Sequence, residues 1–199
     1  MGADRQVEPP LWNIANVLTM LRLVLVPVFI WLFLLGHSGG RLAATIVFII
    51  AAITDKLDGD IARARNLITN FGKIADPIAD KALVMSAMVM LSWTDLMPWW
   101  VTVVIIVREL GITLLRFVMI RRSVMAASKG GKLKTVLQIM FIIGLLMPWS
   151  IIPFLNETAA GALVTTSHVL MYAALGVTVV TGVQYCIDAW RIANAVPER

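Results

Sequence analysis

Residues 55–80 read DKLDGDIARARNLITNFGKIADPIAD and carry four aspartates at helical spacing, Asp55 and Asp58 followed by Asp76 and Asp80. Residues three or four positions apart lie on the same face of a helix, so the carboxylates of each pair point in a similar direction. A short connection over residues 64–75 would bring both pairs to one point. Four like charges at one point repel unless cations bind among them. This stretch, called the aspartate motif below, therefore predicts a divalent-cation site on two consecutive helices.

The sequence around the aspartate motif is that of a membrane protein. Apolar residues make up 59% of the 199 residues and charged residues only 15%, whereas soluble domains carry roughly 25% charged residues. About 20 consecutive apolar residues cross a bilayer. We place six such spans, at residues 18–35, 42–64, 77–93, 98–120, 135–152 and 163–189. The predicted fold is all-α, a polytopic membrane protein with six transmembrane helices in one domain over residues 1–199, of which 1–15 form a polar juxtamembrane N-terminus.

Basic residues are distributed unevenly between the connections of these spans. Lys and Arg are frequent near residues 63–73 and 121–134, and they are absent from the connections at 36–40, 94–97 and 153–166. Basic connections stay on the cytoplasmic side of a membrane. We therefore expect a multi-pass protein of the cytoplasmic (inner) cell membrane, with both termini and the aspartate motif facing the cytoplasm. The net charge of +5 then reflects topology and attraction to anionic lipid, not nucleic-acid binding.

The residue types in the aspartate motif favour Mg²⁺ or Mn²⁺, because the motif contains no His or Cys and carboxylate oxygens are hard ligands. Two such ions would clamp a pyrophosphate. Gly59 and Ala62 stand one turn from Asp55 and Asp58, which leaves room for a nucleotide or, alternatively, for tight helix packing. Arg63 offers a planar fork to a phosphate. An ion-pair network between the aspartates and neighbouring cations is the alternative to a metal site.

The pattern D-x2-D-G-x2-A-R-x8-G-x3-D-x3-D over residues 55–80 resembles the signature of the CDP-alcohol phosphotransferases. These are integral membrane enzymes that displace CMP from a CDP-activated group with an alcohol. The resemblance implies that Asp55, Asp58 and Asp76 ligate metal and that Asp80 is the general base on the acceptor hydroxyl, while also touching the metal. It further implies a homodimer. The nucleotide contacts that it implies are Gly59, Ala62, Arg63 and Thr69, the last of which is otherwise ordinary loop polarity.

Three further stretches, at residues 16–22, 108–116 and 131–138, resemble the members of this family that use CDP-diacylglycerol as donor and sn-glycerol 3-phosphate as acceptor. In the first stretch, Asn16, Thr19 and Arg22 either contact the CDP-linked lipid or cap and anchor the first helix. The sequence leaves these two roles open.

The other two stretches supply three cations, Arg108, Lys132 and Lys134, at or near membrane depth. Such cations are costly there, and a dianionic phosphate is a better partner for them than a neutral polyol or a zwitterion. A basic connection is also what membrane topology demands of Lys132 and Lys134, and Glu109 and the nearby aspartates offer Arg108 structural partners. We expect the three to bind the phosphate of the acceptor.

The resemblance thus implies an enzyme of phospholipid biosynthesis that converts CDP-diacylglycerol and glycerol 3-phosphate to phosphatidylglycerophosphate and CMP. The nearest alternative keeps this chemistry with another acceptor, inositol phosphate first because it is also anionic. A membrane prenyltransferase would carry two separated Asp-rich motifs instead of one continuous motif. A divalent-cation transporter would place its carboxylates near the middle of several spans instead of at one membrane surface.

Overall fold

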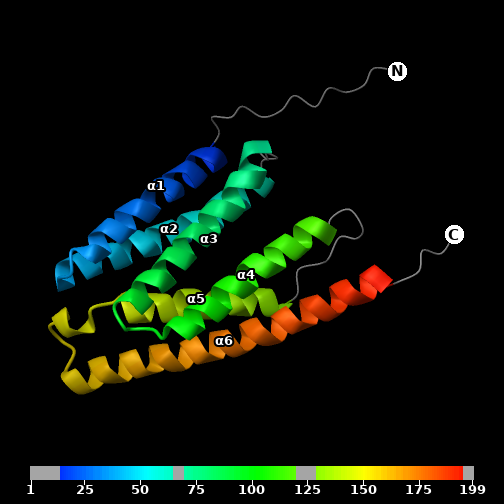
Figure 1. Ribbon diagram of the computed structural model, residues 1–199. Coiled ribbons are helices and arrows are strands. Elements are labelled where there is room, and N and C mark those ends of the chain that lie inside the picture. Colours follow the sequence, from blue (N-terminus) through cyan, green and yellow to red (C-terminus); the bar gives the residue numbers. More distant parts are fainter. Residues whose placement is uncertain (1–13, 65–69, 120–128, 195–199) are drawn as a thin grey trace. The chain divides into compact units, whose positions relative to one another are not determined.

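A computed structural model describes the backbone of residues 14–64, 70–119 and 129–194 (Figure 1). Within these ranges, the side chains of residues 15, 56–64, 70–77, 80, 116–119, 129–132 and 192–194 lie outside the description. The described residues form helices and no strand, which confirms the all-α prediction for them. The helices are α1 (Ile14–Leu34), α2 (Ser38–Ala64), α3 (Asn70–Trp93), α4 (Trp99–Met119), α5 (Lys129–Leu146), a short 3₁₀ helix η1 (Trp149–Ile151) and α6 (Glu157–Asn194).

Three stretches within these helices are long and apolar enough to cross a membrane: Asn16–Leu34, Ser38–Asp55 and Glu157–Arg191. Two shorter apolar helical stretches, Lys81–Trp93 and Leu133–Leu146, lie in α3 and α5. Many large apolar side chains on these helices are exposed, as lipid-facing residues are. The long apolar helices identify a membrane protein, while the count of six spans stays a prediction.

The helices differ from the expected spans at several ends. α3 begins at Asn70, well before the expected apolar run, and therefore includes Asp76 and Asp80. α5 runs from Lys129 to Leu146 and does not reach residue 152, because Pro148 disfavours a helical conformation in the residue before it. With 38 residues, α6 is about 57 Å long. It is therefore longer than a hydrocarbon core of about 30 Å.

The chain divides into two compact units, of which the first comprises residues Met1–Met90 and Leu146–Pro148. In this unit α1 and α2 pack side by side (Figure 1). Phe29 lies between Phe33 and Phe48, with ring centroids 6.1 Å and 6.0 Å apart. The first turn of α2 needs glycine at position 40, since a Cβ at Gly40 would lie 2.7 Å from the carbonyl oxygen of Leu32 in α1. The amide of Gly40 donates to the His37 ring, which caps the start of α2.

The second unit comprises Leu91–Leu145 and Trp149–Arg199. Here α4 packs against α6. The ring of His168 lies 3.1 Å from the carbonyl oxygen of Leu96, which ties α6 to the turn between α3 and α4. The indole of Trp149 donates to the carbonyl oxygen of Gly144 and so fixes η1 against the end of α5. The contact of His168 holds α6 against the turn that precedes α4, the helix that carries Arg108.

Candidate functional site

The aspartate motif lies on two helices of the first unit. α2 continues without interruption through Asp55 and Asp58 to its end at Ala64. α3 is already helical from Asn70, so Asp76 and Asp80 stand one turn apart on it. The predicted helical spacing of both carboxylate pairs is therefore confirmed in the backbone. The convergence of the two pairs on one point stays a prediction.

Asp55 has a partner that the sequence did not reveal. Its Oδ1 pairs with Nη1 of Arg22, which comes from α1. The Arg22 side chain is completely buried, whereas the Asp55 side chain keeps 39% of its surface exposed. A buried arginine in an apolar helix needs a carboxylate or a comparable partner, and this requirement was the available signal. α1 therefore supplies the counter-ion of the first motif aspartate.

Asn16 and Thr19 are buried with Arg22 at three-residue intervals along α1. Asn16 lies inside the helix, two residues after its start at Ile14, and so does not occupy the capping position that one reading of the sequence gave it. Arg22 does not snorkel toward water, because none of its surface is exposed. These three residues form a polar side of α1 that faces protein.

Several predicted site residues lie outside the described side chains or outside the described residues altogether. Within the described side chains, no group of three or more potential metal ligands occurs. Asp55 is the only motif aspartate whose side chain the structure describes. The residues concerned are Asp58, Gly59, Ala62, Arg63, Asp76, Asp80 and Lys132, whose side chains are not described, and Thr69, which falls between α2 and α3.

The second unit brings two of the predicted phosphate-binding cations to one carboxylate. Oε1 of Glu109 on α4 accepts a hydrogen bond from Nζ of Lys134 on α5. The same oxygen lies 3.3 Å from Nη1 of Arg108. The prediction that Glu109 partners Arg108 is confirmed, and the contact with Lys134 was not anticipated. We call Arg108, Glu109 and Lys134 the cation cluster.

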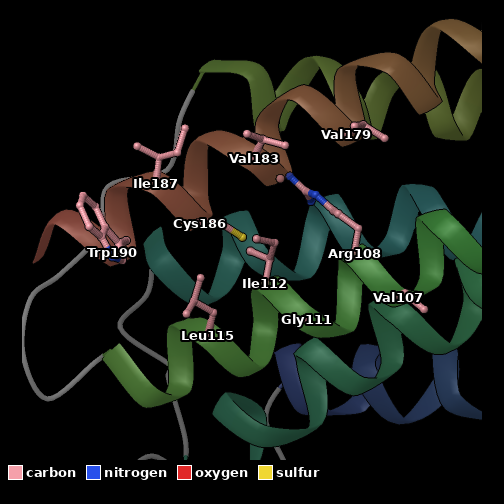
Figure 2. Close-up of a pocket in the computed structure, with 11 residues that line it drawn as sticks. Val107, Arg108, Gly111, Ile112, Leu115, Val179, Val183, Cys186, Ile187 and Trp190 are labelled. Carbon is pink, nitrogen blue, oxygen red and sulfur yellow. The ribbon is translucent and has the colours of Figure 1, made fainter. Parts of the chain in front are cut away.

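Arg108 is also anchored to α6. Its Nε donates to the carbonyl oxygen of Thr178 at 3.1 Å, and its Nη2 donates to Oγ1 of Thr181 at 2.7 Å. Figure 2 shows the side chain reaching from α4 to α6. Gly182 favours this approach, because a Cβ there would lie only 3.1 Å from Cγ of Arg108. The guanidinium is thus held by groups of both α4 and α6.

An apolar groove of about 680 Å³ lies beside Arg108 between α4 and α6 (Figure 2). Apart from Arg108, its lining is almost entirely apolar, so it offers a phosphate no further charged partner. Arg108 therefore belongs both to the charged cation cluster and to the lining of an apolar groove. The groove is lined by Val107, Arg108, Gly111, Ile112, Leu115, Val179, Gly182, Val183, Cys186, Ile187 and Trp190.

Gln138 is a polar residue to which the sequence assigned no role. It stands one turn after Lys134 on α5 and is buried. Its Nε2 makes no hydrogen bond to any residue that the structure describes. A buried amide nitrogen without a protein partner is costly, and a bound ligand or water commonly satisfies such a group. Its place in an apolar run, four residues after Lys134, was the sequence signal that could have identified it.

Comparison with known proteins identifies the family of this chain. Residues 12–180 match the family model of CDP-alcohol phosphatidyltransferases. A Mycobacterium tuberculosis protein named probable phosphatidylglycerophosphate synthase is 47% identical over 90% of this chain and 82% of its own length. A Bacillus subtilis protein named CDP-diacylglycerol–glycerol-3-phosphate 3-phosphatidyltransferase is 37% identical over 90% of this chain and 96% of its own length. An Escherichia coli protein of the same name is 40% identical over 68% of this chain and 77% of its own length. The chain therefore belongs to the CDP-alcohol phosphatidyltransferase family.

Proposed function

We propose that this transferase moves the phosphatidyl group of CDP-diacylglycerol to sn-glycerol 3-phosphate, forming phosphatidylglycerophosphate and CMP in phospholipid biosynthesis. The observation that carries the proposal is the placement of Arg108 and Lys134 at one carboxylate, which offers two cations to the phosphate of the acceptor. The names of the M. tuberculosis and B. subtilis relatives support the same reaction. Family membership also favours a transferase over the transporter and prenyltransferase alternatives.

The reaction exchanges one phosphorus–oxygen bond for another. The acceptor hydroxyl oxygen bonds to the phosphorus that carries diacylglycerol, and the bond from that phosphorus to the bridging oxygen breaks, so CMP departs with this oxygen. We assign the hydroxyl proton to the carboxylate of Asp80, acting as general base. Arg108, Lys132 and Lys134 hold the acceptor phosphate and so present the hydroxyl for attack. In this proposal the aspartate motif binds the donor through metal ions, and the cation cluster binds the phosphate of the acceptor.

Asp55, Asp58, Asp76 and Asp80 would hold one or two Mg²⁺ or Mn²⁺ ions. The chemistry of this donor set fits, since all four ligands are carboxylates and each pair lies on a continuous helix. The Asp55 side chain keeps 39% of its surface exposed and so stays accessible to an ion. When bound, such ions supply positive charge to the pyrophosphate and to the departing CMP.

We assign binding of the donor, CDP-diacylglycerol, to residues in and near the first half of the aspartate motif. Gly59, Ala62, Arg63 and Thr69 bind its nucleotide and pyrophosphate in this proposal. Asn16, Thr19 and Arg22 support the donor site from α1. The burial of all three and the pairing of Arg22 with Asp55 favour an indirect role, in which α1 orients the motif.

The proposal extends to membrane placement and assembly. Six spans would put both termini and the aspartate motif at the cytoplasmic face, as the distribution of Lys and Arg favours. A homodimer follows from the family resemblance alone. Cysteine accessibility from each side of sealed vesicles, with cysteines introduced at positions 37 and 73, would test the topology, and light scattering in detergent would test the dimer.

The decisive experiment measures CMP release by the detergent-purified protein with CDP-diacylglycerol and Mg²⁺. Glycerol 3-phosphate, inositol phosphate, inositol and serine are added one at a time. Release with glycerol 3-phosphate alone supports the proposal. Release only with another acceptor keeps the transfer chemistry and refutes the acceptor assignment. No release with any acceptor, together with metal flux into vesicles, would favour a transporter.

A further inference from the structure

Glu109 joins the two cations to which the proposed function assigns the acceptor phosphate, yet the transfer reaction itself gives it no task. We propose that Glu109 is a positioning residue, whose carboxylate holds the Arg108 guanidinium and the Lys134 ammonium together so that a single phosphate group contacts both. The inference rests on the proposed function and names the ligand class of this cluster as an organic phosphate dianion.

The contacts of Glu109 carry the first step. One oxygen, Oε1, serves both cations, as it accepts from Lys134 Nζ and lies 3.3 Å from Arg108 Nη1. The side chains of Arg108, Glu109 and Lys134 are only 13%, 14% and 9% exposed. Water therefore screens this group weakly, and each charge depends on its neighbours. Sharing one oxygen brings the two cations within reach of one small anion.

The two cations differ in how firmly they are held. Arg108 is fixed on α6 through Thr178 and Thr181. Thr181 is itself oriented, because its Oγ1 donates to the carbonyl oxygen of Val177 at 2.7 Å. Lysine has a flexible four-carbon stem, and its ammonium takes its position from its partners. Glu109 on α4 therefore fixes the position of the Lys134 ammonium relative to Arg108, which α6 holds.

The charges of the cluster explain why an acidic residue improves a phosphate site. One carboxylate and two cations leave a net charge of +1 on these three side chains. Without Glu109, two poorly solvated cations would repel each other, and the lysine would move away. With Glu109, they stay adjacent and still favour an anion. A neutral polyol or a zwitterion would leave this positive charge uncompensated.

The test compares Glu109→Gln with the wild-type protein and with Glu157→Gln, a matched change at an exposed glutamate in the first turn of α6. Gln keeps the size of the side chain and removes its charge. We expect the KM for glycerol 3-phosphate to rise about tenfold in Glu109→Gln, as loss of a charge-assisted hydrogen bond implies. The KM of Glu109→Gln for CDP-diacylglycerol should stay within twofold of wild type. The KM values of Glu157→Gln for both substrates should do the same.

Two further variants separate positioning from a structural role. Glu109→Asp keeps the charge on a shorter chain and should restore part of the acceptor affinity. In a Lys134→Met background, Glu109→Gln should raise the acceptor KM much less than it does alone, because the residue acts through Lys134. An unchanged acceptor KM with a lower melting temperature would overturn the proposal in favour of a structural ion pair. A lower acceptor KM would overturn it as well, since Glu109 would then compete with the phosphate.

Direct binding distinguishes failure of this inference from failure of the proposed function. Calorimetric titration with glycerol 3-phosphate and with inorganic phosphate needs no donor and no turnover. If the wild-type protein releases no CMP with glycerol 3-phosphate but binds these anions more tightly than Glu109→Gln does, the proposed function fails and the role of Glu109 stands. If the wild-type protein binds neither anion, Glu109 positions no phosphate and the inference is wrong.

Discussion

Arg22 of α1 pairs with Asp55 of α2, so the first carboxylate of the aspartate motif is held by a neighbouring helix. The arginine is completely buried, and the carboxyl side chain is partly exposed. One end of the pair therefore belongs to the packed interior of the first unit, and the other end reaches the surface where a ligand can bind. This arrangement orients Asp55 through a contact between α1 and α2.

Replacing Arg22 should destabilise the protein more than replacing an exposed arginine. In Arg22→Met the stem is roughly matched in volume, but Asp55 loses its counter-ion. Because Asp55 is partly solvated, we expect a loss of about 1–3 kcal/mol in the free energy of unfolding. The measurement is denaturant unfolding in detergent, followed by tryptophan fluorescence.

The matched control for this change is Arg191→Met, which removes an exposed arginine from the last part of α6. It should change the free energy of unfolding by less than about 0.5 kcal/mol, as surface substitutions usually do. Equal losses in the two variants would show that the Arg22–Asp55 pair contributes no specific stability.

The sequence predicted the helices of the motif well, because spacing within one helix is a local property. Asp55 and Asp58 needed only a continuous α2, and Asp76 and Asp80 only a helix that begins before them. Helix ends were less predictable, since hydropathy marks the part that lies in lipid and not the part that is helical. α6 illustrates this, as its polar ends remain helical beyond the apolar run.

Contacts between helices were beyond the reach of the sequence. Periodicity places Arg22 on a face of α1 but does not say which helix covers that face, so the pair with Asp55 was missed. The same holds for Lys134 and Glu109, which are 25 residues apart in the chain. Arg108 and Glu109 are adjacent in sequence, and their contact was foreseen for that reason.

Asp80→Asn should abolish turnover while leaving donor binding largely intact. The amide has the shape of the carboxyl group but cannot take the proton of the acceptor hydroxyl. Loss of a general base lowers turnover by roughly 10²–10⁴-fold. CMP release gives the rate, and equilibrium binding of CDP-diacylglycerol gives the affinity.

The control for this prediction is Asp95→Asn in the turn between α3 and α4. Asp95 has a φ of 57°, a conformation that asparagine adopts readily. This variant should keep wild-type turnover. CMP release at the wild-type rate in Asp80→Asn would refute the assignment of Asp80 as the base.

Lys134→Ala should weaken acceptor binding selectively. The lysine is buried, and its ammonium lies at the Glu109 carboxylate beside Arg108. Removing one charged partner of a phosphate costs roughly 10–100-fold in affinity. We expect the KM for glycerol 3-phosphate to rise by this factor and the KM for CDP-diacylglycerol to change little, as measured by CMP release at saturating co-substrate. Lys134→Arg retains the charge and should recover part of the affinity, and an unchanged acceptor KM in Lys134→Ala would remove this residue from the phosphate site.

Gly182→Ala and Gly111→Ala make a matched pair, on α6, which Arg108 contacts, and on α4, which carries Arg108. A Cβ at Gly182 would lie 3.1 Å from Cγ and 3.4 Å from Nε of Arg108, whereas a Cβ at Gly111 would meet no atom within 4 Å. Alanine is favoured over glycine inside a helix by roughly 0.5–1 kcal/mol, so Gly111→Ala should raise the melting temperature and leave both KM values unchanged.

Gly182→Ala gains the same helix propensity but displaces the Arg108 side chain from its position against α6. We therefore expect no gain in melting temperature and a KM for glycerol 3-phosphate about three- to tenfold above wild type, as a cost near 1 kcal/mol at a tight contact implies. Thermal unfolding and CMP release on the two variants in parallel provide the measurement. If both substitutions raise the melting temperature and neither changes the acceptor KM, then the close approach of α6 at Gly182 does not govern the position of Arg108.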